Sequence, residues 1–109
     1  MALSQTEQTA LSQFKDALHE RFKDDLIDVT LYGSKARGDD RKDSDLDVLV
    51  VLAPDNWRLS DVVCSIATDI LLDWEVDISP KVISRKIYLN LQKQESSFIR
   101  NVIRDGIPL

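Results

Sequence analysis

The amino-acid sequence predicts an α/β fold built around a small β-sheet. Helical and strand-like patterns follow one another in the order helix, strand, strand, helix, strand and two further helices. Hydrophobic residues make up 43% of the chain and charged residues 30%, which is the balance of a globular protein. The length of 109 residues predicts a single domain, residues 1–109.

Apolar spacing and β-branched runs predict the first half of the fold. A capping box precedes apolar residues at helical spacing, which indicates a helix over residues 5–24. Residues 26–32 are rich in β-branched and aromatic side chains and stop at a glycine, so they predict a strand. Residues 46–53 form a nearly unbroken apolar run before a proline, which is typical of a central strand covered on both faces.

The second half of the chain is predicted to contain one long helix, one strand and two short helices. From Ser60 an apolar stripe predicts a long helix that ends near Asp73. Residues 74–79, closed by a proline, predict a short strand. Two shorter helical patterns follow, one around residues 87–91 and one through residues 98–103.

Charge and hydropathy argue against several classes of protein. The net charge of −5 disfavours binding to duplex nucleic acid. No stretch approaches the roughly 18 apolar residues of a membrane span, and the N-terminus lacks a signal-peptide pattern, so we expect a cytoplasmic protein. The one cysteine, Cys64, has valine and isoleucine neighbours, which predict a small buried side chain rather than a nucleophile.

Three aspartates form the candidate site. Asp45 and Asp47 open the most hydrophobic strand, and residues i and i+2 of a strand point to the same side. Two such charges ~4 Å apart repel by about 4 kcal/mol at an effective dielectric of about 20, and a bound divalent cation such as Mg²⁺ removes this repulsion. If a right-handed crossover makes the strands 46–53 and 74–79 parallel, Asp77 lies beside the other two.

A candidate phosphate-binding turn follows the first strand. Gly33 permits a tight turn and a close approach of backbone to ligand, and Ser34 can donate its hydroxyl and N–H groups. The next residues could begin a short helix whose N-terminus attracts phosphate. Dense basic charge near the acids comes from Lys35, Arg37, Arg41 and Lys42. If strand 26–32 is antiparallel to the central strand, the turn and the acids meet, as a metal–nucleoside triphosphate would require.

The segment around these residues resembles a known motif. The matching stretches are Gly33 to Gly38 and Ser44 to Asp47, with ten residues between Ser34 and Asp45. This pattern resembles the DNA polymerase β-like nucleotidyltransferase superfamily. Within it, the short chain resembles the minimal nucleotidyltransferases, which are commonly paired with HEPN-domain partners, and the likeness extends over essentially the whole chain.

The resemblance implies a mixed sheet flanked by helices and a transfer reaction. A nucleoside monophosphate, AMP from ATP, would pass to a hydroxyl group while pyrophosphate leaves. By analogy, Asp45 and Asp47 would hold a pair of Mg²⁺ ions, and Asp77 would share the ion that activates the acceptor oxygen. Gly33 and Ser34 would bind the β- and γ-phosphates.

Several of these candidate site residues have a second interpretation. Arg37 is either a phosphate contact or an ordinary exposed residue. Ser44 either reaches phosphate or braces its own loop. Asp77 has a simpler interpretation as a surface acid at a sheet edge, and Gly33 with Ser34 as a plain turn and helix cap.

Three functions remain compatible with the sequence. In relatives known as antitoxins, the resemblance implies transfer of AMP to a tyrosine of an HEPN ribonuclease partner, so we expect an HEPN-domain partner. An antitoxin that neutralises its partner by contact alone is the first alternative. A small-molecule nucleotidyltransferase that works as a homo-oligomer is the second, and the apolar patch at residues 98–103 is compatible with self-association.

Overall fold

The computed structural model describes residues 3–38 and 45–109. The helices are α1 (Gln5–Phe22), a 3-10 turn η1 (Lys23–Asp25), α2 (Ser34–Arg37), α3 (Arg58–Trp74), α4 (Arg85–Lys93) and α5 (Ser97–Asp105). The strands are β1 (Leu26–Tyr32), β2 (Leu46–Leu52), β3 (Ile78–Ser84) and β4 (Ile107–Pro108). The predicted α/β fold with a mixed sheet flanked by helices is confirmed.

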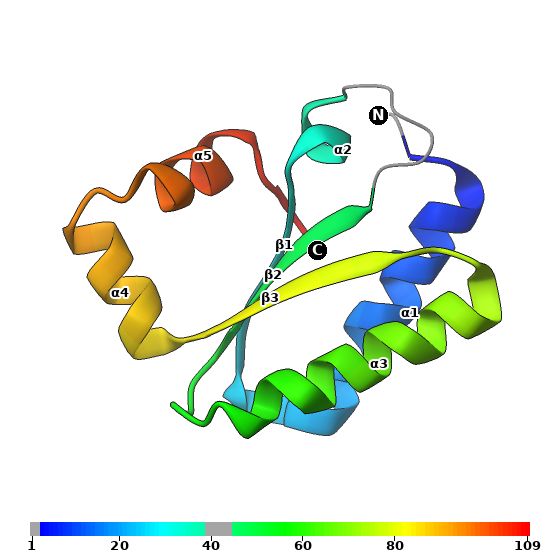
Figure 1. The fold of residues 1–109 in the computed structure, drawn as a ribbon, viewed down its shortest axis with the longest axis horizontal. Helices are drawn as coiled ribbons and strands as arrows, with labels where there is room; N and C mark the ends of the chain where they lie inside the picture. The colour runs from blue at the N-terminus through cyan, green and yellow to red at the C-terminus, as the bar shows by residue number, and fades with distance from the viewer. Residues whose placement is uncertain (1–2, 39–44) are drawn as a thin grey trace.

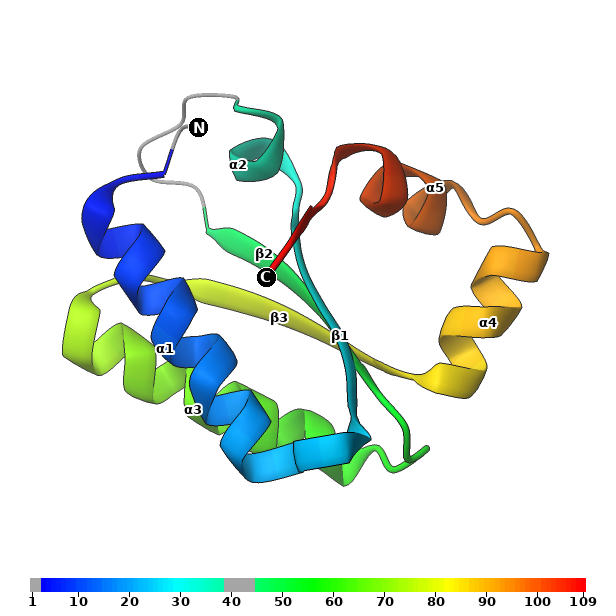
Figure 2. The same cartoon turned by 180° about the vertical axis from the view of Figure 1, so that it is seen from behind.

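The strands form one sheet in the order β3-β2-β1-β4. β1 is antiparallel to both β2 and β4, whereas β2 and β3 are parallel and joined by α3, as predicted. Helices α1 and α3 cover one face of the sheet, and α4 with α5 cover part of the other (Figure 1). Seen from behind, the C-terminal strand β4 runs along β1 at the edge of the sheet opposite β3 (Figure 2).

Side chains of β2 alternate between two apolar cores, which explains why this strand reads as a continuous hydrophobic run. Leu46, Val48, Val50 and Leu52 join the cluster with α1 and α3. Leu49 and Val51 join a smaller cluster with residues of α5, among them Ile99 and Val102. Because side chains alternate along a strand, Asp47 belongs to the face that carries α4 and α5.

The capping box predicted before α1 is present. The Glu7 N–H donates to Ser4 Oγ at 3.1 Å, and the Ser4 N–H donates to Glu7 Oε1 at 2.9 Å. Two orphan donors of the first turn are therefore satisfied, which is worth about 0.5–2 kcal/mol. Phe14 and Leu18 of this helix are fully buried against the sheet.

The predicted bounds of the third strand are wrong. Helix α3 continues to Trp74 and ends where Glu75 adopts a positive φ of 55°. The strand β3 begins only at Ile78 and passes through Pro80 instead of stopping there. Proline has no N–H to donate, and it is tolerated because β3 is an edge strand with one unpaired side.

Two further features differ from the sequence-based expectation. Cys64 is exposed rather than buried, because the buried stripe of α3 runs through Val63, Ala67 and Ile70 and leaves Cys64 beside it. The short strand β4 was not predicted, and the Leu109 N–H continues its pairing by donating to the Val29 carbonyl at 2.9 Å. Over the described residues, no helix combines the length and the apolar character needed to cross a membrane.

Candidate active site

The three predicted acids lie on neighbouring segments at one end of the sheet. Asp47 is the second residue of β2, and Asp45 directly precedes that strand. Asp77 directly precedes β3. The sequence had predicted that Asp77 lies inside a strand, and this prediction is wrong. Its backbone carbonyl accepts a hydrogen bond of 2.9 Å from the Leu46 N–H, which ties the segment before β3 to the start of β2.

Asp45 interacts electrostatically with both other acids. Burial, and then the charge of Asp45, raise the pKa of Asp47. Burial, the charge of Asp45 and a side-chain hydrogen bond with Asp45 raise the pKa of Asp77. The charge of Asp45 thus repels the other two carboxylates, and Asp47 and Asp77 ionise less readily than an isolated aspartate.

The acids interact in pairs, Asp45 with Asp47 and Asp45 with Asp77, and do not form a complete set of metal ligands. Within the described residues, no three Asp, Glu, His or Cys side chains lie close enough together to hold a metal ion. The donor chemistry nevertheless fits Mg²⁺, which takes carboxylate oxygens and keeps several waters. A bound cation would relieve both causes of the raised pKa values, the burial of the charges and their repulsion by Asp45.

Gly33 contacts the acid site directly. Its backbone has φ 79° and ψ −157°, a region that is essentially restricted to glycine. A Cβ atom built on Gly33 would lie 2.5 Å from Oδ2 of Asp47. The turn predicted to bind phosphate and the acid predicted to bind metal are therefore adjacent, since Tyr32 and Asp47 are also paired across the ladder.

The other predicted phosphate contacts are only partly placed. Ser34 begins α2, and Arg37 ends it with an exposed side chain. Gly38 then closes the helix in the left-handed conformation, at φ 80°. Ser44 lies outside the described residues, as do Arg41 and Lys42.

Lys35 is not available as a phosphate contact. The side chain is 3% exposed, and its Nζ lies 3.4 Å from Oε2 of Glu7 in the first turn of α1. The ion pair links α2 to α1 and leaves the ammonium group facing the protein interior. The amphipathic pattern of α1 carries no signal that Glu7 has a partner in a segment so distant in the chain.

Helix α5 lies beside the end of the sheet that carries the three acids. The ring of Phe98 meets the ring of Tyr32 edge-on, with centroids 5.4 Å apart. Burial, and then the charge of Asp47, raise the pKa of Tyr32. A hydrogen bond from Arg104 lowers the pKa of Asp105 at the end of α5, and the charge of Arg37 contributes in the same direction.

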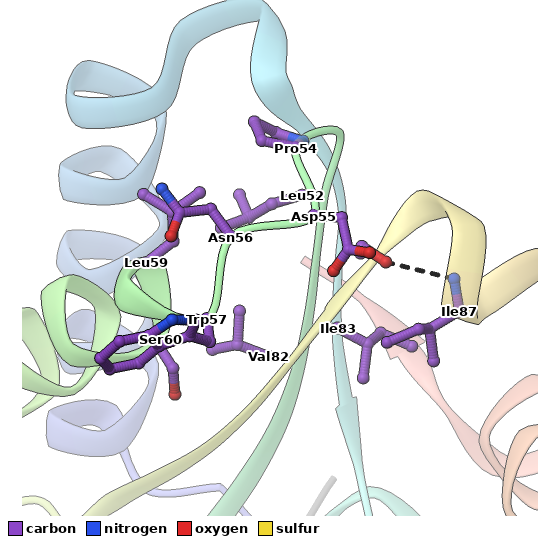
Figure 3. A pocket seen from close by; sticks show the side chains of 11 residues that line it. Leu52, Pro54, Asp55, Asn56, Trp57, Leu59, Ser60, Val82, Ile83 and Ile87 are labelled. Carbon is purple, nitrogen blue, oxygen red and sulfur yellow. Dashed lines mark hydrogen bonds between the residues drawn. The ribbon is translucent and has the colours of Figure 1, made fainter.

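Two pockets lie at opposite ends of β2 and β3. One of about 320 Å³ is lined by Asp45 and Asp77. Its other lining residues are Cys64, Ala67, Thr68 and Leu71 of α3 and Ile78, Ser79 and Pro80 of β3. The second, of about 230 Å³, lies where these strands end, and only Asp55 among its lining residues carries a carboxylate (Figure 3). The acid end of the sheet, which carries Asp45, Asp47 and Asp77, is therefore the candidate active site.

Paired carboxylates at the start of a central strand, beside a glycine turn that opens a short helix, form an arrangement suited to an enzyme that transfers nucleotides. The comparison with known families agrees. Residues 11–107 match the model of the nucleotidyltransferase domain, and the chain belongs to this family.

Relatives and solved structures support the same assignment. The chain is 34% identical to "Putative protein adenylyltransferase MJ0604" of Methanocaldococcus jannaschii, over 92% of this chain and 94% of the relative. It is similar, with a TM-score of 0.56 and 25% identity, to "Structure of putative minimal nucleotidyltransferase", over 94% of both chains. It also shares its fold, with a TM-score of 0.56 and 17% identity, with a chain of "Crystal structure of the toxin-antitoxin with AMP-PNP", over 87% of this chain and 68% of that one.

Proposed function

We propose that the protein is a Mg²⁺-dependent protein adenylyltransferase that acts as an antitoxin. It transfers AMP from ATP to a hydroxyl group, a tyrosine of an HEPN-domain toxin. The observation that carries this proposal is the adjacency of Gly33 and Asp47, because it joins the turn predicted to bind phosphate to an acid predicted to bind metal. The names of the similar proteins support both the adenylyl group and the toxin–antitoxin setting.

Each site residue has a role in this reaction. Asp45, Asp47 and Asp77 would hold a pair of Mg²⁺ ions, which would supply positive charge at the reacting oxygens. Gly33 and Ser34 bind the terminal phosphates through backbone N–H groups and the serine hydroxyl. Arg37 and Ser44 are the further phosphate contacts.

The chemistry is an in-line displacement at the α-phosphorus. The acceptor oxygen forms the new P–O bond, and the bond between the α-phosphorus and the bridging oxygen breaks, so that pyrophosphate leaves with that oxygen. The acceptor hydroxyl approaches from the pocket beside Asp45 and Asp77, and the Asp77 carboxylate accepts its proton. The turn at Gly33 holds the triphosphate tail on the other side of β2, so donor and acceptor approach from opposite directions.

The intact mass of the partner tests this function. The protein is mixed with the product of the adjacent gene, ATP and Mg²⁺, and the partner is expected to gain the mass of one or more AMP groups. Asp47→Asn should abolish the gain, because it keeps the shape of the side chain and removes the charge. Asp55→Asn, in the pocket at the opposite end of the sheet, removes the same charge and should leave transfer intact.

Two results would contradict the proposal. Equal transfer by Asp47→Asn and by the parent would refute the site assignment. Neutralisation of the partner without any gain in mass would instead favour an antitoxin that acts by contact alone.

A further inference from the structure

Lys81 is the only basic residue in the described strands. β1, β2 and β4 contain no Lys or Arg, and β3 contains only this one. β3 follows Asp77 and pairs with β2, which carries Asp47, so this positive charge lies in a strand that borders the candidate site. The position of this positive charge therefore bears on the charge of the ligand that the site would bind.

Lys81 lies on the same face of the sheet as Asp47. In the parallel pair, Ser79 is the partner of Asp47 and Lys81 is the partner of Leu49. Partners in register share a face, and Leu49 packs in the cluster with α5. The Lys81 Nζ lies 5.1 Å from the ring centroid of Phe98 in α5, which confirms the direction of the side chain.

The Lys81 ammonium group is directed toward Phe98 of α5 and forms no ion pair with a described carboxylate. No carboxylate among the described residues lies within ion-pairing distance, and the side chain is exposed. Its contact is the face of Phe98, whose ring packs edge-on against Tyr32, the cross-strand partner of Asp47. Such a contact is worth about 0.5–1 kcal/mol at an exposed site, so it orients the cation without holding it firmly.

We propose that Lys81 binds the phosphates of the nucleotide and is a further catalytic residue; this rests on the proposed function. Lys81 is two residues beyond Ser79, roughly 7 Å along the strand, which the flexible lysine stem can span. Bound metal ions would offset the three carboxylates, but the triphosphate brings its own negative charge. The transition state concentrates charge on the non-bridging oxygens of the α-phosphate, where a fixed cation lowers its energy.

A matched pair of charge-removing variants tests this role. Lys81→Met removes the cation and keeps the stem, whereas Arg58→Met removes a guanidinium that lies 5.5 Å above the Trp57 ring at the opposite end of the sheet. Both variants make the same change in net charge and in cation–π contact. Binding of AMP-PNP and of inorganic pyrophosphate, each with Mg²⁺, is measured by calorimetry.

We expect Lys81→Met to weaken binding of both probes about tenfold, or about 1.4 kcal/mol, and to lower the transfer rate further. Arg58→Met should match the parent, and Lys81→Arg should restore most of the affinity. Equal affinities of Lys81→Met and Arg58→Met would overturn the assignment of Lys81 while the proposed function stands. Failure of the parent to bind AMP-PNP would refute the proposed function. In that case, pyrophosphate binding that is weakened in Lys81→Met would still support an anion site at Lys81. If the parent bound neither probe, the anion site would be refuted together with the proposed function.

Discussion

Replacing Gly33 by alanine tests the contact between the phosphate turn and the acid site. The added Cβ would lie 2.5 Å from Oδ2 of Asp47, and ordinary contact begins at 3.4 Å. The carboxylate must therefore move by about 0.9 Å, and misplacement of a catalytic group by about 1 Å can cost about 10²-fold in rate. We expect Gly33→Ala to lose AMP transfer by about this factor.

The same substitution at Gly38 is the matched control. Both glycines have a positive φ, 79° and 80°, so alanine is strained at either position. The strain costs about 1–3 kcal/mol at Gly33 and about 1–2 kcal/mol at Gly38. Among the residues that the structure describes, a Cβ on Gly38 would meet no atom within 4 Å, so this variant changes stability without touching Asp47.

Two measurements separate these effects. Thermal unfolding should show a lower Tm for both variants, by about 4–8 °C for each kcal/mol lost. Mass analysis of the partner, at a temperature where both variants are folded, should show the loss of transfer only for Gly33→Ala. Similar transfer by the two alanine variants would refute the proposed link between the turn and Asp47.

Four further predictions concern single residues and their contacts. Lys35→Met leaves Glu7 without its buried partner. The variant should have a free energy of unfolding lower by on the order of 2 kcal/mol, measured by urea titration. A value equal to that of the parent would show that the ion pair does not stabilise the fold. Asp47→Asn should lower the pKa of Tyr32, followed by absorbance at alkaline pH, and an unchanged midpoint would argue against their proximity. Since the folded state keeps this tyrosine protonated above its usual pKa of 10.0, the free energy of unfolding should fall as pH rises past that value. Cys64 should react with a thiol reagent in the native protein, and reaction only after unfolding would contradict its exposure.

Strong local patterns allowed most of the fold to be predicted. The strand 26–32 and the apolar run after Asp45 match β1 and β2 closely, because both combine β-branched residues with a glycine or proline at the end. The parallel pairing of β2 with β3 followed from the intervening helix and the right-handed crossover rule. These two arguments also brought Asp77 beside Asp45.

The errors arose where tertiary contacts override a local pattern. Pro80 is a stop signal in an isolated sequence, but an edge strand leaves one side unpaired and can contain it. The burial of Lys35 depends on Glu7, whose distance in the sequence conceals the contact. The exposure of Cys64 depends on how α3 is rotated against the sheet, which apolar neighbours do not determine.

Pro80 also has a consequence for assembly. An open strand edge offers a row of N–H and C=O groups along which another polypeptide can extend the ladder. Pro80 interrupts the donors of that row in β3, close to the acid end of the sheet. The β3 edge is therefore a poor template for strand addition, which leaves the entrance to the carboxylates beside it clear for an incoming hydroxyl group.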